Sequence, residues 1–342
     1  MYETKSSAFD MIFLGLIPSK TRGLLIYLKL DGGESVKVAK NIYELIGKTP
    51  VVELTKFSLP KGVRLFAKLE YFNPGGSVKD RLGQELIREA LAGGELVPGG
   101  TIIEPTAGNT GIGLALSAIQ YGINVIFCVP EKFSMEKQEI MKALGAKVVH
   151  TPTNKGIKGA IEKAYELAKE IPNSYVPQQF SNPANPRTYY KTLGPELYEQ
   201  LDGQIDIFVA GSGSGGTFMG TAKYLKENIQ GVKTVIVEPE GSILNGGESG
   251  PHKTEGIGME FLPPYMDRAY FDGIYTILDE DAFKRVKELA GKEGILAGSS
   301  SGAALHAALL EAEKAKNGTN IVMIFPDSSD RYLSKKIYEG GI

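Results

Sequence analysis

The chain has 342 residues, of which 42% are hydrophobic and 23% are charged, and its net charge is −2. This length and composition are typical of a soluble globular protein of about two domains with a large buried core. Because the charge is nearly balanced, there is no electrostatic reason to expect nucleic acid or a membrane surface as a partner.

Cysteine and histidine are too sparse for a disulfide or a metal framework. The single cysteine, Cys128, cannot form an internal disulfide, and this fits a cytoplasmic location. The histidines His150, His252 and His306 are far apart and share no motif with acids or with Cys128. We therefore expect no metal site.

The first forty residues do not resemble the rest of the chain. The apolar run 11–17 is too short to span a bilayer, and it lacks the positive charge and cleavage site of a signal peptide. The codons of Asp31-Gly32-Gly33-Glu34, ahead of Val36, could read as a ribosome-binding sequence before a valine start. We interpret residues 1–35 as mistranslated leader or non-catalytic extension, and 1–41 as an atypical N-terminal segment.

From about residue 63 onward, short apolar runs alternate with helical patterns. In residues 156–171 the apolar positions recur at steps of three and four, which predicts a helix with one buried face. Alternation of strands and helices indicates an α/β fold with parallel sheets covered by helices on both faces. Ligands in such folds bind beyond the carboxyl ends of strands. The predicted strands are 64–69, 101–104, 124–129, 147–150, 175–177, 207–210, 234–237 and 320–325.

A domain boundary is expected at residues 182–186. Pro183 and Pro186 interrupt both the helical and the strand periods there.

The first motif of chemical interest is residues 73–81, Asn-Pro-Gly-Gly-Ser-Val-Lys-Asp-Arg. Ser77 can cap the helix that follows, so Lys79 lies in its first turn. The positive helix end disfavours an ammonium there and favours the neutral amine, the form that makes a Schiff base. Taken alone, the motif favours a surface lysine, because most lysines are exposed.

The second motif, residues 104–111, follows a predicted strand and begins a helix. Backbone N–H groups at such a helix start bind anions such as a carboxylate. Thr106 and Thr110 add hydroxyl donors, and Asn109 adds an amide that can reach a phenolic oxygen. A helix-capping turn without further function is the alternative.

The third motif is the glycine-rich loop 211–217, which follows the predicted strand 207–210. Its glycines let the backbone approach a phosphate, and the next helix start favours the negative charge. Such a loop also occurs in dinucleotide-binding oxidoreductases, but no acidic residue ends a strand about twenty residues further on, where a ribose would need one.

The fourth motif, residues 297–302, is Ala-Gly-Ser-Ser-Ser-Gly before another predicted helix. Its hydroxyls can cap that helix, or one of them can hydrogen-bond a ring nitrogen.

Together, these motifs resemble the cysteine synthase and cystathionine β-synthase family of fold-type II pyridoxal-phosphate enzymes. The resemblance covers about residues 42–335. It implies the tryptophan-synthase-β-like fold, with two domains that are each a twisted, mostly parallel sheet flanked by helices. Residues 73–182 would form the smaller substrate-binding domain, and 42–72 with 183–342 the larger cofactor-binding domain. Membership of the family also implies a homodimer.

The resemblance assigns roles to individual residues. Lys79 matches the Schiff-base lysine, Asn109 the partner of the cofactor's 3′-oxygen, and Ser300 the hydroxyl that faces the pyridine nitrogen. Gln179 matches a further ligand of the substrate carboxylate. The carboxylate loop comprises Thr106, Ala107, Asn109 and Thr110, and the phosphate cup comprises Gly213, Ser214, Gly215, Gly216 and Thr217. Two positions depart from the usual pattern, because Ala107 replaces a serine and Ser214 a threonine.

The implied reaction is β-replacement on an amino acid. A neutral serine at the pyridine nitrogen makes the ring a weak electron sink, which favours prompt loss of the β-substituent. Lys79 would remove the α-proton and later return it, and a thiol or sulfide would add to an enzyme-bound aminoacrylate.

The nucleophile depends on residues 255–263. Glu255 and Glu260 flank Gly-Ile-Gly-Met in the manner of cystathionine β-synthases, and they can meet the ammonium group of homocysteine. With Ala107, this pattern resembles bacterial enzymes that make cystathionine from O-acetylserine (or serine). The alternatives are a cysteine synthase that uses sulfide, a dinucleotide-binding oxidoreductase, and a catalytically dead member that serves as a binding partner, against which Lys79 argues.

Overall fold

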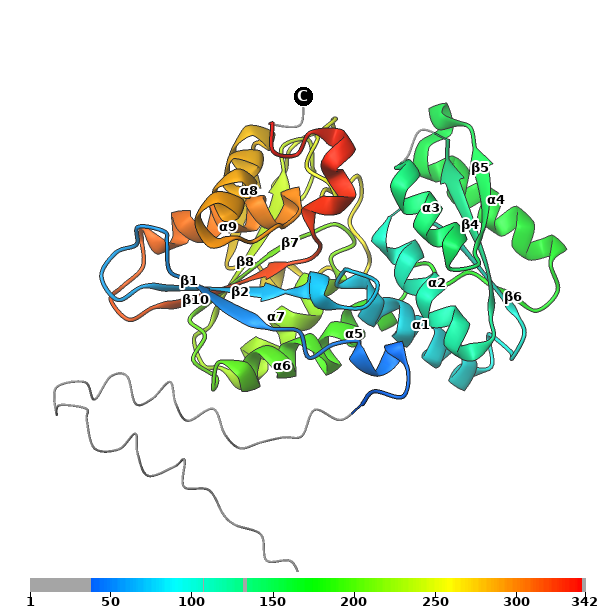
Figure 1. Ribbon diagram of the computed structural model, residues 1–342, viewed down its shortest axis with the longest axis horizontal. Helices are drawn as coiled ribbons and strands as arrows, with labels where there is room; N and C mark the ends of the chain where they lie inside the picture. The colour runs from blue at the N-terminus through cyan, green and yellow to red at the C-terminus, as the bar shows by residue number, and fades with distance from the viewer. Residues whose placement is uncertain (1–37, 107, 132–133, 340–342) are drawn as a thin grey trace, which may run out of the picture. The chain divides into compact units, whose positions relative to one another are not determined.

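The computed structural model describes residues 38–106, 108–131 and 134–339 (Figure 1). Residues Asn41–Ile342 form one compact unit. The interpretation of residues 1–35 as a leader lies outside the described residues. Within those described, no helix is long and apolar enough to cross a membrane.

The larger sheet has six strands in the order β1-β2-β10-β7-β8-β9. All neighbours in it are parallel except β1 and β2, which are antiparallel. Its central strands read as continuous apolar runs because helices cover both of their faces. The bounds are β1 Val51–Leu54, β2 Arg64–Leu69, β7 Ile207–Gly211, β8 Lys233–Pro239, β9 Gly273–Ile277 and β10 Asn320–Phe325.

The smaller sheet has four parallel strands in the order β5-β4-β3-β6. The predicted strand 175–177 is shorter and earlier than expected. It ends at Tyr175 because Pro177 has no N–H for a ladder and Gln178 adopts a positive φ of 57°. The bounds are β3 Thr101–Pro105, β4 Asn124–Pro130, β5 Lys147–Thr151 and β6 Ser174–Tyr175.

Helices cover both faces of each sheet (Figure 1). In the larger sheet, Val322 and Ile324 face the core beneath α5, α6 and α7, whereas Ile321 and Met323 face the core beneath α8 and α9. In the smaller sheet, α1 and α2 share one core with β3 and β4, and α4 covers the other face. The bounds are α1 Lys79–Gly93, α2 Asn109–Tyr121, α3 Met135–Ala143, α4 Gly156–Glu170, α5 Ala184–Lys191, α6 Leu193–Gln200, α7 Gly216–Asn228, α8 Asp279–Glu293 and α9 Ser299–Ala312.

Short 3-10 helices complete the described elements. They are η1 Ile42–Leu45, η2 Glu70–Phe72, η3 Thr153–Lys155, η4 Arg268–Tyr270 and η5 Ser329–Lys335.

The prolines near residue 184 mark the start of a helix. Helix α5 begins at Ala184, and Pro186 lies in its first turn, where a missing N–H costs no helical hydrogen bond. The chain passes here from the four-stranded sheet, which ends with β6, toward β7 of the six-stranded sheet. The division into a substrate-binding and a cofactor-binding domain stays a prediction.

Candidate active site

Lys79 is the first residue of α1, and the segment before it is attached to the loop after β10. The Ser77 hydroxyl accepts the Lys79 N–H at 3.3 Å, and the Val78 N–H donates to the Pro326 carbonyl oxygen at 2.9 Å. Ser77 also forms an isolated β-bridge with Asp327. Pairing with a distant strand end therefore sets where Lys79 begins its helix.

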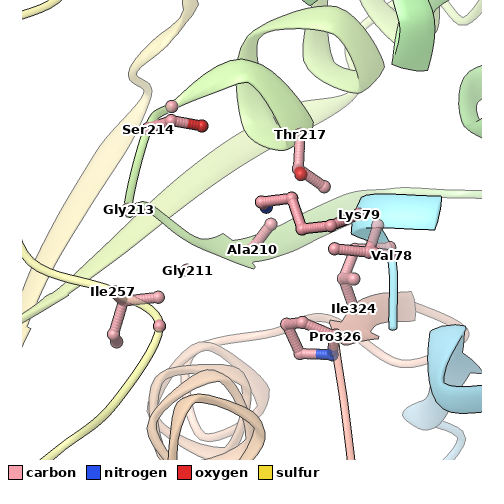
Figure 2. Close-up of a pocket in the computed structure, with 12 residues that line it drawn as sticks. Val78, Lys79, Ala210, Gly211, Gly213, Ser214, Thr217, Ile257, Ile324 and Pro326 are labelled. Atoms are coloured by element: carbon pink, nitrogen blue, oxygen red, sulfur yellow. The ribbon is translucent and has the colours of Figure 1, made fainter. Parts of the chain in front are cut away.

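A cavity of about 570 Å³ brings the four sequence motifs together. Lys79 lines it, as do Ser300 in the first turn of α9 and Gln179 after β6. Further lining residues from the predicted site are Thr106, Asn109, Thr110, Gly213, Ser214 and Glu255. Gly215 and Thr217 line a small adjoining cavity of about 20 Å³ together with Lys79, and Figure 2 shows the Lys79 side chain directed toward the segment that carries Thr217.

Two described residues of the predicted site do not line these cavities, and a third predicted residue is not described. Gly216 is buried in the first turn of α7 behind the loop. Glu260 is exposed and lies outside the described lining. Ala107 is outside the described residues.

The environment of Lys79 favours a neutral amine. Burial lowers the pKa of Lys79 to about 8, against the opposing charges of Asp327 and Glu70. A lysine with this pKa carries a useful fraction of nucleophilic, basic amine near neutral pH.

The loop between β7 and α7 has the shape of an anion cradle. Gly215 adopts a positive φ of 83°, and α7 begins at the next residue. The first N–H groups of a helix have no acceptor within the helix, so they can bind an anion. A Cβ at Gly213 would collide with the Gly256 carbonyl oxygen, so the backbone there has no room for a side chain. The geometry therefore fits a phosphate, with Ser214 and Thr217 supplying hydroxyls.

Thr110 and Gln179 meet although they are far apart in sequence. The Thr110 hydroxyl donates to Gln179 Oε1 at 2.7 Å. The buried carboxyl of Glu104 accepts the N–H groups of Gln178 and Gln179 at 3.0 and 3.2 Å. Burial raises the pKa of Glu104 to about 7, and those two N–H donors oppose the rise. Glu104 thus supports the turn that presents Gln179.

Asn109 is joined to the segment after β10. Its Nδ2 donates to Asp327 Oδ2 at 2.6 Å, and Arg331 Nη1 donates to its Oδ1 at 2.6 Å. The Tyr332 hydroxyl donates to the same Asp327 oxygen, and burial, together with the Asp327 carboxylate, raises the pKa of Tyr332. These contacts hold the Asn109 amide in one orientation at the cavity wall.

Glu255 lies in an ion-pair cluster at the cavity. Its Oε2 is 3.2 Å from Lys137 Nζ of α3, and its Oε1 pairs with Lys335 Nζ of η5. Lys137 Nζ also donates to the Tyr332 hydroxyl at 3.2 Å.

Sequence reasoning missed Asp327, Arg331, Tyr332, Lys137 and Lys335. The first three follow the predicted strand 320–325, and the rule that ligands bind beyond strand ends could have singled them out. Lys137 carries no local signal, because it is one lysine on an ordinary helix.

A family model described as "Pyridoxal-phosphate dependent enzyme" matches residues 42–327. The chain belongs to this family. It is 67% identical over 305 residues to the O-acetylserine dependent cystathionine beta-synthase of Bacillus subtilis (strain 168), with 89% of this chain and 99% of the relative covered. It is 56% identical over 303 residues to a cysteine synthase of Helicobacter pylori (strain ATCC 700392 / 26695), with 88% of this chain and 99% of the relative covered.

The comparison with solved structures supports the same family. The crystal structure of O-acetylserine dependent cystathionine beta-synthase from Helicobacter pylori matches with a TM-score of 0.85 and 56% identity, covering 88% of this chain and 99% of that one. The predicted α/β fold and the predicted cofactor, pyridoxal phosphate, are confirmed. The glycine-rich loop therefore belongs to a pyridoxal-phosphate enzyme, and the oxidoreductase alternative is wrong.

Proposed function

We propose that this enzyme catalyses β-replacement, converting O-acetylserine (or serine) and homocysteine into cystathionine in sulfur amino-acid metabolism. The observation that carries the proposal is the shared cavity, in which Lys79 lies with the glycine-rich loop and with the Thr110–Gln179 pair. The similarity to the Bacillus subtilis relative supports the choice of substrates.

Different residues of the cavity are assigned to different parts of the cofactor. The loop from Gly213 to Thr217 would hold the phosphate, Asn109 would hydrogen-bond the 3′-oxygen, and Ser300 would hydrogen-bond the pyridine nitrogen. Lys79 would provide the covalent attachment. When bound, pyridoxal phosphate supplies an electron sink for the negative charge that develops at the substrate's α-carbon.

The substrate carboxylate is assigned to the start of α2. Thr106, Thr110 and the first N–H groups of the helix offer donors there, and Gln179 completes the set from the opposite side. Ala107, which the family resemblance groups with these residues, lies outside the described residues. With the carboxylate held, the α-carbon is oriented toward Lys79.

Lys79 then moves the proton. Its lowered pKa lets the released amine take the α-proton at neutral pH, after which the β-substituent leaves as acetate or hydroxide. The thiol adds to the β-carbon from the cavity, and Lys79 returns the proton to the α-carbon. Asp327 and Glu70 act on the same amine, and their negative charges keep its pKa from falling further.

Glu255 and Glu260 are the candidates for recognising the nucleophile. Glu255 lines the cavity and therefore can meet the homocysteine ammonium, whereas Glu260 is exposed outside the lining. Cysteine synthase activity with sulfide is the second candidate function, because the chain is also 56% identical to a cysteine synthase. Sulfide carries no charged amino-acid group and needs no such partner.

Product analysis tests the proposal. Purified enzyme is incubated with O-acetylserine or serine, crossed with homocysteine or sulfide, and the products are quantified by mass spectrometry. We expect cystathionine from O-acetylserine and homocysteine, and no product from Lys79→Ala, which retains the fold. Cysteine from sulfide without cystathionine would instead establish the second function.

Assembly, location and domain roles are part of the proposal. A homodimer in the cytoplasm is expected from the family, and light scattering measures the mass in solution. The domain roles are supported by the two sheets. The four-stranded sheet leads into the Thr110 and Gln179 segments, and the six-stranded sheet carries the 211–217 loop.

A further inference from the structure

Three charged side chains from distant parts of the chain meet at the cavity. Lys137 comes from α3, Lys335 from the end of η5, and Glu255 from the segment between β8 and β9. All three line the cavity, and the two ammonium groups share the Glu255 carboxylate, with Lys137 on Oε2 and Lys335 on Oε1. Within the cavity lining, two ammonium groups therefore share the Glu255 carboxylate, and Glu136 adds a negative charge near both lysines from outside the lining.

Lys137 is an unusually buried cation. Its side chain is 5% exposed, and its Nζ lies 4.4 Å from the centre of the Tyr332 ring. Burial lowers the pKa of Lys137. An ammonium has three donors, and Lys137 uses two of them on Glu255 and the Tyr332 hydroxyl. Among the described residues the third donor has no hydrogen-bond partner, so it can meet an acceptor in the cavity.

Lys335 is more accessible, with 49% of its side chain exposed. Burial of the rest lowers the pKa of Lys335, the nearby charge of Lys137 lowers it further, and the negative charge of Glu136 opposes both effects. The other acid that lines the cavity, Asp327, is already bonded to Asn109 and Tyr332. An incoming carboxylate would therefore relieve the repulsion between the two lysines.

We propose that Lys137 and Lys335 bind the α-carboxylate of the amino-acid thiol, while Glu255 positions both lysines and accepts the thiol's ammonium group. The inference rests on the proposed function, because it concerns the second substrate of that reaction. The residues differ from Thr110 and Gln179, which are assigned to the first substrate, and both sets line the same cavity. Together the three side chains complement a zwitterion, which sulfide is not.

The competing explanation is a structural one, in which the ion pairs only hold η5 against α3. The two explanations differ in their dependence on the nucleophile. A lost structural contact lowers the use of every nucleophile, whereas a lost carboxylate partner affects only nucleophiles that carry a carboxylate.

The test compares Lys335→Gln with wild type on four nucleophiles, with O-acetylserine as the first substrate. Homocysteine has both charged groups, 4-mercaptobutyrate has only the carboxylate, 3-aminopropane-1-thiol has only the ammonium, and sulfide has neither. Lys336→Gln is the matched control, because Lys336 is exposed, pairs with Glu339 and does not line the cavity.

We expect Lys335→Gln to lower kcat/KM roughly threefold to tenfold for homocysteine and 4-mercaptobutyrate, and to leave the other two nucleophiles unchanged. Lys137→Gln should show the same pattern with a larger loss, because its ammonium is more buried. Glu255→Gln should lower use of 3-aminopropane-1-thiol as well as of homocysteine.

Equal losses for all four nucleophiles in Lys335→Gln, or no loss for any, would overturn the inference while wild-type cystathionine synthesis left the proposed function intact. If wild type makes no cystathionine, the proposed function fails, and the inference fails with it.

Discussion

Gln179 and Ser214 are bonded to the same side-chain nitrogen, Nδ2 of Asn185. The distances are 2.7 Å to the Gln179 carbonyl oxygen and 3.0 Å to the Ser214 hydroxyl. The Tyr265 hydroxyl connects the same two segments, because it lies 2.8 Å from both the Gln179 and the Ser214 carbonyl oxygens. The segment assigned to the substrate carboxylate is thus tied to the loop assigned to the cofactor phosphate.

Asn185→Ala should therefore weaken both binding events. Loss of two buried hydrogen bonds, each contributing about 1 kcal/mol, should raise the KM for O-acetylserine and the Kd for pyridoxal phosphate by roughly tenfold. Steady-state kinetics and cofactor titration of the apoenzyme measure the two effects. Asn228→Ala is the control, because Asn228 is an exposed asparagine that bonds only a helix carbonyl among the described residues. A change in one constant without the other would show that the two loops are not coupled.

Gly213→Ala should greatly lower the amount of cofactor bound to the enzyme. The new Cβ collides with the Gly256 backbone, so the loop must move away from the shape that fits a phosphate. Cofactor content by absorbance after purification is the measurement, and we expect a large loss with the fold retained by circular dichroism. Gly291→Ala is the matched control, because nothing lies near its Cβ within α8. That control should gain about 0.5–1 kcal/mol of stability from the better helix former.

The rate of cofactor incorporation should depend on pH through Lys79. Burial lowers the pKa of this lysine to about 8, and only the neutral amine attacks an aldehyde. The neutral fraction is roughly a tenth at pH 7, so the rate of reconstitution of the apoenzyme should rise steeply to about pH 8 and then level off. Stopped-flow absorbance follows the reaction. A rate that still rises between pH 9 and 10 would place the pKa of Lys79 at its ordinary value.

Glu104→Gln should change how stability depends on pH. Burial raises the pKa of Glu104 from 4.5 to about 7, so the folded protein holds its proton more tightly than the unfolded chain does. The resulting stability is fully present below pH 4.5 and is lost as pH rises through about 7. A shift of this size corresponds to about 3 kcal/mol. The difference in the free energy of unfolding between wild type and variant should therefore fall between pH 5 and 8, and a constant difference would contradict the raised pKa.

The sequence by itself determined the central strands and the loops that follow them. Strands β2 and β10 have the predicted bounds, because residues buried on both faces form mainly apolar runs, interrupted in β2 only by Lys68 after Arg64, that need no tertiary information to recognise. The edge strands β1 and β9 were not predicted. Their mixture of exposed and buried positions gives no such run, and each pairs with a neighbour on one side only.

The candidate site likewise combines residues that the local sequence indicates with contacts that only tertiary packing creates. Lys79, Asn109 and the 213–217 loop could be named as candidates because a helix start or a glycine-rich turn is encoded by adjacent residues. Their roles came from the family resemblance and stay predictions. Only the tertiary structure decided that Lys137 and Lys335 share Glu255, and that Asn185 joins Gln179 to Ser214. These contacts connect side chains far apart in the sequence, and their partners are chosen by how the elements pack, a choice that leaves no periodic or local pattern along the chain.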